Sequence, residues 1–176
     1  MNRRTAVRNI VFISAGASLC SRCTSASNDA SIPLKNISVT GAQQTMLADL
    51  AEAIIPKTNN FIGAADLKTH EFILTMVDDC MSPEDQKSFT NGMKAFGDAC
   101  QKKFNTAFVK FTPAQKSELL KEMETRGGDD EAAKFYKTVK GYTIRSFATS
   151  KDFLVNVRKW KLVPGPVFKG CVPVTA

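Results

Sequence analysis

Hydrophobic residues recur every three or four positions along most of the chain, with polar residues between them. This spacing gathers apolar side chains on one face of a helix, whereas strands would need strict alternation, which does not occur over any useful length before residue 160. The pattern predicts an all-α single domain of about five to six helices. They are expected over residues 40–55, 66–80, 82–104, 112–126 and 129–147, with a short helix around residues 153–157.

Capping residues predict where these helices begin. Thr40 and Gln43 have the spacing of a capping box, in which a hydroxyl and an amide side chain bond the first free backbone N–H groups. Ser82 precedes a proline and two acidic residues, a combination that favours the first helical turn. The expected N-caps are Thr40, Asp66, Ser82, Thr112 and either Asp129 or Asp130.

The two ends of the chain lack helical periodicity. Three prolines (Pro164, Pro166 and Pro173) follow Trp160, and a regular helix cannot contain them. The polar run at residues 21–31 also fits no periodic element. We therefore divide the chain into a signal peptide (1–23), a linker (24–39) and a helical domain (40–176) that ends in an extended arm (160–176).

The first residues have the pattern of an export signal. Arg3 and Arg4 precede an apolar stretch at residues 10–19, which is too short to span a membrane as a helix. A basic start followed by a short apolar run is typical of a cleavable signal, and paired arginines favour the twin-arginine route. The alternative is the basic N-terminal helix of a cytosolic protein, which the polar run after it argues against.

The point of cleavage is open. Residues 15–17 offer small side chains at the positions that a signal peptidase reads. Cys20 and Cys23 raise the alternative of a lipid anchor, although each follows a bulky residue rather than the small one that lipidation favours. The sequence therefore predicts export and leaves the mature terminus undecided.

Composition and charge limit the classes of function. An apolar share of 43% and a mean hydropathy of −0.16 exclude a disordered chain and a polytopic membrane protein. The formal charge of +7 falls to +3 without the four arginines of residues 1–23. Residues 132–176 carry nine Lys or Arg against the single acid Asp152. This segment is a candidate docking surface for an acidic protein, a phosphate backbone or an anionic lipid, or else a solvated basic face.

No arrangement of side chains predicts catalysis. His70 is the single histidine and has no metal-ligand partners at a suitable spacing. Asp78 and Asp79 are interpreted as helix-end carboxylates, and the aromatic residues fall on core-facing stripes, which argues against nucleic-acid binding. Glycine-rich phosphate loops and nucleophile motifs are absent from the sequence. We predict no catalytic, cofactor-binding or metal-binding residue in this chain.

The cysteines require a chemical explanation, because exported proteins meet an oxidising compartment. Cys100 lies on an apolar helical stripe and is expected to be a small core residue. Cys80 ends a predicted helix and Cys171 lies in the predicted arm. These two are candidates for a disulfide, either with each other or with another chain.

Several segments, taken together and in order, resemble one family. They are the Arg3–Arg4 signal, the sequence Ala-Ile-Ile-Pro ending at Pro56, residues 79–84 (Asp-Cys-Met-Ser-Pro-Glu), residues 111–115 (Phe-Thr-Pro-Ala-Gln) and the ending at residues 163–171. The chain resembles the small (third) subunit of gluconate 2-dehydrogenase-type complexes. The resemblance covers nearly the whole chain, although each of its pieces is generic by itself.

The resemblance implies a non-catalytic subunit in the periplasm, attached to the cytoplasmic membrane through the complex or a lipid anchor. In such complexes a large flavoprotein holds FAD and oxidises a sugar or sugar acid, and a multihaem cytochrome holds haem c. The small subunit binds the flavoprotein and carries its export signal. The alternative is a stand-alone periplasmic or lipid-anchored binding protein that uses a basic C-terminal surface. The residues expected to dock a partner are Arg158, Lys159, Trp160, Lys161, Pro164, Gly165, Phe168 and Gly170.

Overall fold

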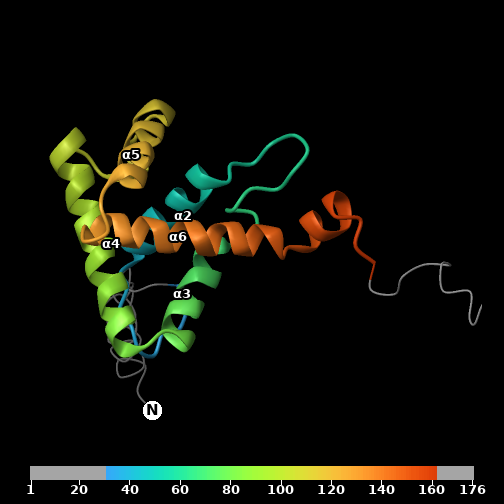
Figure 1. The fold of residues 1–176 in the computed structure, drawn as a ribbon, viewed down its shortest axis with the longest axis horizontal. Helices are drawn as coiled ribbons and strands as arrows, with labels where there is room; N and C mark the ends of the chain where they lie inside the picture. The colour runs from blue at the N-terminus through green and yellow to red at the C-terminus, as the bar shows by residue number, and fades with distance from the viewer. Residues whose placement is uncertain (1–30, 162–176) are drawn as a thin grey trace, which may run out of the picture.

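The computed structural model describes residues 31–161, and within this range the chain is helical, which confirms the predicted all-α class. The chain folds around α6, which crosses the middle of the molecule and extends beyond it at one end (Figure 1). The elements in order are α2 (Gly41–Ile54), α3 (Thr69–Cys80), α4 (Pro83–Phe104), the 3-10 turn η1 (Phe108–Lys110), α5 (Pro113–Thr125), α6 (Glu131–Ala148) and the π-helical turn η2 (Phe153–Val157).

Four of the predicted N-caps are confirmed. The Thr40 and Thr112 hydroxyls accept the N–H groups three residues later, and each forms a complete capping box. The Ser82 hydroxyl accepts the N–H of Asp85 at 3.2 Å and is followed by the predicted proline. Asp130 accepts two N–H groups at the start of α6. Short-range hydrogen bonds therefore set most helix starts, as the sequence predicts.

The prediction that Asp66 caps the second helix is wrong. The helix α3 begins at Thr69, and its N-cap is Lys68, which adopts the left-handed conformation without a side-chain cap. The Asp66 carboxylate instead pairs with the Lys57 ammonium at 3.0 Å and accepts the Gly63 N–H at 3.3 Å. The preceding loop thus provides partners for Asp66, and the N-cap lies two residues later than predicted.

Four helices pack against α6, and its approach to α4 depends on one glycine. At Gly92 of α4 an added Cβ atom would lie 2.7 Å from the Glu131 carbonyl oxygen and 2.7 Å from the Phe135 Cβ atom. Real Cβ atoms do not approach backbone this closely. The absence of a side chain at Gly92 therefore lets the two longest helices cross in direct contact.

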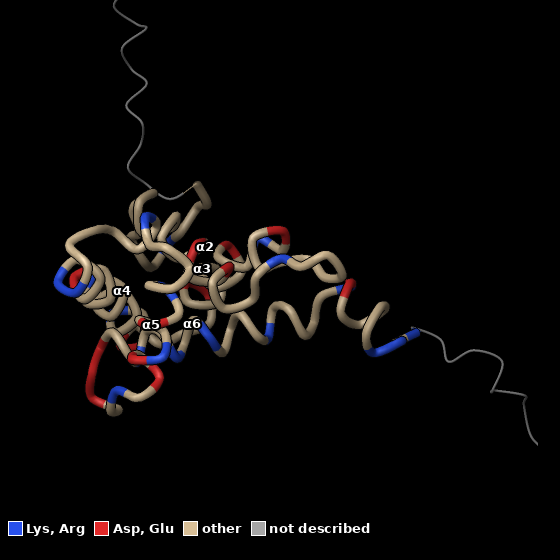
Figure 2. Tube along the Cα trace, turned by 90° about the horizontal axis from the view of Figure 1, so that it is seen from above, with Lys and Arg blue, Asp and Glu red and all other residues tan. Residues whose placement is uncertain are grey.

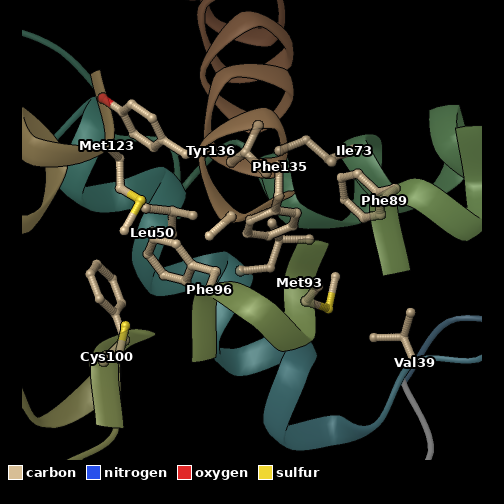
Figure 3. Close-up of a cluster of buried hydrophobic side chains, with 14 of the residues drawn as sticks. Val39, Leu50, Ile73, Phe89, Met93, Phe96, Cys100, Met123, Phe135 and Tyr136 are labelled. Atoms are coloured by element: carbon tan, nitrogen blue, oxygen red, sulfur yellow. The ribbon is translucent and has the colours of Figure 1, made fainter. Parts of the chain in front are cut away.

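The core lies around this crossing, between α4 and α6 (Figure 3). Phe89, Met93, Phe96 and Cys100 of the predicted α4 stripe are buried, and Phe135 of α6 contacts both phenylalanines, with ring centroids 5.1 and 5.6 Å away. Tilted rings at these separations pack favourably. The stripe is confirmed over its first four members, while its last member is only half-buried at the end of α4.

Residues 31–39, assigned above to the linker, pack on the helical body. The buried Asp78 carboxylate at the end of α3 accepts the N–H groups of Lys35, Asn36 and Ile37 at 2.7–2.9 Å. Burial would raise the pKa of Asp78, but the three N–H donors outweigh it and hold the pKa below its ordinary value. Asp78 therefore fixes the entry of the chain into the domain, a role different from the helix-end carboxylate that we predicted.

Replacing Gly92 by alanine tests the helix crossing. A methyl group in a helix normally stabilises by roughly 1 kcal/mol relative to glycine, but here it has to displace backbone and should cost about 1–3 kcal/mol through overpacking. Gly97→Ala in the same helix is the control, because its Cβ would meet only the Met46 sulfur at 4.0 Å. Urea unfolding should show opposite signs for the two variants. Equal effects would contradict the crossing.

Replacing Asp78 by alanine should lower the free energy of unfolding by about 3 kcal/mol, because one buried and two partly buried N–H groups lose a charged acceptor. The exposed neighbour Asp79→Ala is the control. Since the folded pKa is lowered, the contribution is complete at neutral pH and is lost as the pH falls through that pKa. The stability difference between wild type and Asp78→Ala should therefore shrink in acid. A pH-independent difference would contradict the role of the charge.

Candidate partner-docking surface

The one histidine lacks the surroundings of a catalytic group. His70 is half-buried near the start of α3, and its buried Nδ1 has no hydrogen-bond partner. Burial lowers the pKa of His70, which the Glu71 charge partly opposes. Within residues 31–161 no group of three or more His, Cys, Asp or Glu side chains is placed to hold a metal. The buried Nδ1 of His70 therefore has no group to orient it, as a catalytic imidazole would require.

The two described cysteines differ in accessibility. Cys100 is buried in the core, and burial raises the pKa of its thiol to about 12. Cys80 is exposed at the end of α3. Cys171 lies outside the described residues, so the predicted disulfide of Cys80 stays a prediction.

The cations of α6 fall into two sets. In the helix up to Lys140, Lys140 pairs with Glu124 of α5, Lys134 lies 3.8 Å from Asp129, and Lys137 donates to a backbone carbonyl. In the second half and beyond, Arg145, Lys151, Arg158, Lys159 and Lys161 form no ion pair within residues 31–161. Figure 2 shows the resulting basic stretch at the end of the described chain.

The same end of the molecule exposes large apolar side chains. Ile144 in the last turns of α6 is 48% exposed, Val155 and Val157 of η2 are 45% and 42% exposed, and Trp160 is 52% exposed. The helix α6 is the main neighbour of η2, where the Phe147 and Phe153 rings lie 5.3 Å apart. We call this region, residues 144–161, the α6–η2 end. It combines unpaired positive charge with exposed apolar surface.

Hydrogen bonds to backbone N–H groups hold the α6–η2 end in a defined shape. The Ser150 hydroxyl accepts the N–H of Phe153 at 3.2 Å. At the other side of the turn, Lys159 is left-handed with φ of 52°, and the Trp160 N–H donates to the Leu154 carbonyl at 2.9 Å. This bond and the left-handed Lys159 end the π-helical turn η2. Trp160 is therefore an exposed side chain on an ordered backbone.

Half of the predicted docking residues lie at this end. The structure places Arg158, Lys159, Trp160 and Lys161 there, all exposed. The remaining predicted residues (Pro164, Gly165, Phe168 and Gly170), like Arg3 and Arg4, lie outside the described residues. The sequence analysis missed the exposure of Ile144, Val155 and Val157. A signal was present, because Val155 and Val157 are two positions apart and cannot share one helical face.

Within residues 31–161, none of the helices combines the length and the apolar character that crossing a membrane requires.

Comparison with known proteins gives a family. Residues 41–165 match the family described as Gluconate 2-dehydrogenase subunit 3. The match starts with α2 and includes the α6–η2 end, so most of the core and the candidate docking surface belong to the shared domain. No curated protein and no solved structure matches the chain.

Thiol reactivity tests the assignment of the cysteines. Since alkylation requires the thiolate, Cys100 should resist iodoacetamide in the native protein and react only after unfolding. Cys80 should react with iodoacetamide in reduced native protein. If Cys80 forms a disulfide, it should not react in protein that is isolated from an oxidising compartment without reduction. Peptide mapping without reduction identifies its partner, Cys171 or a cysteine of another chain. Full alkylation of Cys80 in unreduced native protein would contradict the pairing.

Proposed function

The chain belongs to the gluconate 2-dehydrogenase subunit 3 family, and we propose that it is the non-catalytic accessory subunit of a periplasmic, FAD-dependent sugar or sugar-acid dehydrogenase complex. The family description supports a subunit of a multi-subunit dehydrogenase complex. The proposal adds that this chain binds the large flavoprotein subunit and that the complex is associated with the cytoplasmic membrane.

The single observation that carries the proposal, beside the family, is the exposed α6–η2 end. A domain that acted alone would gain nothing from holding Val155, Val157 and Trp160 in water. Exposed apolar groups that gather on one surface mark contact sites. Aromatic and apolar anchors beside basic side chains are the usual composition of such sites, where tryptophan and arginine contribute most of the binding energy.

In this proposal the chemistry belongs to the partner subunits. The flavoprotein binds FAD and removes two electrons and two protons from the substrate, and a multihaem cytochrome with haem c passes the electrons on. This chain contributes no reacting group. His70 has no polar contact through its buried Nδ1, which supports a structural role for that residue.

The export part of the proposal rests on the sequence of the N-terminus. Arg3 and Arg4 precede a moderately apolar stretch, which favours the route that moves folded proteins. A flavoprotein that has already bound FAD in the cytoplasm could then cross the membrane with this subunit. The accessory subunit would supply the signal for both chains.

Replacing Arg3 and Arg4 together by lysine tests this role. Lysine keeps the charge but loses the planar guanidinium donors, so we expect both this chain and the co-expressed flavoprotein to stay in the cytoplasm. Immunoblots of cytoplasmic and periplasmic fractions provide the measurement. Arg8→Lys, outside the pair, is the control and should leave export within about twofold of wild type. Normal periplasmic amounts of both subunits in the double variant would refute the export role.

A further inference from the structure

A second exposed element lies at the same end of the molecule as η2. Among residues 31–161 six large apolar side chains stand out as exposed, and four of them belong to the α6–η2 end. A fifth is Phe61, 39% exposed, in the loop between α2 and α3. Figure 1 shows this loop projecting over the end from which α6 and η2 extend. Only Val109 in η1 lies elsewhere.

The loop is held closed at its base by one carboxylate. Glu52 of α2 accepts the N–H of Lys57 and the N–H of Ala65, both at 2.8 Å, and so joins the beginning of the loop to its end. Gly63 passes so close to this carboxylate that an added Cβ would lie 2.7 Å from both of its oxygens. The Glu52 side chain therefore fits a space that only glycine leaves open.

Further contacts hold the tip of the loop. The Thr58 N–H donates to the Phe61 carbonyl at 3.0 Å, and the Phe61 N–H donates to the Thr58 hydroxyl at 3.1 Å. Asp66 closes the loop a second time through Lys57 and Gly63. Phe61 is thus presented from a tight turn whose backbone groups are already bonded, so little conformational entropy remains to be lost on binding.

We propose that this loop (residues 56–66) and the α6–η2 end form one docking surface for the flavoprotein subunit. Phe61 and Trp160 would enter apolar pockets of the partner, and the unpaired cations would face acidic side chains around those pockets. The inference rests on the proposed function and deepens it, because it assigns the surface of this chain and the chemistry of the surface that it contacts.

The charges favour an acidic protein over a second copy of this chain. Self-pairing of the α6–η2 end would bring Arg145, Lys151 and Arg158 of one copy against the same cations of the other, which is unfavourable. Fixed backbones also favour a protein over a lipid surface. A fluid bilayer adapts to side chains in many positions, whereas binding in a protein pocket costs less entropy when the side chains are already held in place.

The test measures binding of the purified full chain to the co-expressed flavoprotein subunit by surface plasmon resonance. Phe61→Ala and Trp160→Ala should each weaken binding about tenfold, as expected for anchor residues, and the double variant more than either. Val109→Ala is the matched control, because Val109 is 46% exposed but lies away from this end. It should bind within about twofold of wild type.

Charge reversal tests the acidic rim. Arg158→Glu with Lys159→Glu should slow association severalfold and weaken its dependence on salt, because steering by unpaired cations is lost. Lys87→Glu with Lys94→Glu in α4 reverses two exposed cations elsewhere and serves as the control. Equal association rates for the two double variants would overturn the cationic part of the surface.

The loop brace is tested through Glu52, a positioning residue. Glu52→Gln keeps the side-chain shape but weakens the acceptor, so hydrogen exchange of the Lys57 and Ala65 amides should accelerate and binding should weaken severalfold. Phe61→Ala should weaken binding without accelerating exchange at Ala65. A Glu52→Gln variant with faster exchange and wild-type affinity would show that the loop is not part of the surface.

The outcomes separate this inference from the proposed function. No binding of the wild-type chain to the flavoprotein would refute the proposed function. Binding that Phe61→Ala and Trp160→Ala leave at the level of Val109→Ala would overturn the docking surface alone. Two other findings would also overturn it. In the first, Phe61→Ala and Trp160→Ala lose binding to phosphatidylglycerol vesicles but keep binding to the flavoprotein. In the second, the wild-type chain sediments as a dimer and these variants do not. Circular dichroism melting confirms that each variant is folded.

Discussion

The close crossing of α4 and α6 at Gly92 is the constraint on which the rest of the structure depends. It brings Phe135 between Phe89 and Phe96 and fixes α6 as the helix against which α2, α3, α4 and α5 pack. Because helix interfaces are close-packed, a shift of α6 along α4 would disturb every one of these contacts. The position of the exposed end beyond the body follows from the same crossing, since α6 continues in a straight line past its last partner (Figure 1).

Local chemistry explains how much of the fold could be predicted. The helix starts at Thr40, Ser82, Thr112 and Asp130 depend on hydrogen bonds over two or three residues, which a sequence displays directly. Asp66 is an aspartate like Asp130 and also lies just before a helix, but its carboxylate contacts Lys57 and Gly63 of the preceding loop. A cap can therefore be read from sequence only where no longer-range partner competes for the carboxylate.

Contacts between distant residues explain what could not be predicted. Asp78 binds a segment more than forty residues earlier, and nothing in its neighbourhood distinguishes it from Asp79. The Glu52 brace likewise depends on a loop closing thirteen residues later. At the candidate site, the basic residues Arg158, Lys159 and Lys161 were evident from charge alone. The exposure of Phe61 and Ile144 depends on how the neighbouring elements pack, which the local sequence does not display.

The division of α6 into two halves links stability to the proposed role. Up to Lys140 the helix carries the buried Phe135 and Val139, and its cations contact acids or a carbonyl, so this part of α6 belongs to the fold. Beyond Lys140 the helix still buries Thr143 and packs Tyr142 on Phe72, and the Thr69 and Ser146 hydroxyls, 3.2 Å apart, mark a late contact with α3. Because no residue of η2 is buried, its exposed valines and the cations around them contribute little to the core and are available to bind a partner. Substitutions beyond Ser146 should therefore change partner affinity far more than stability, while those before Val139 should do the reverse.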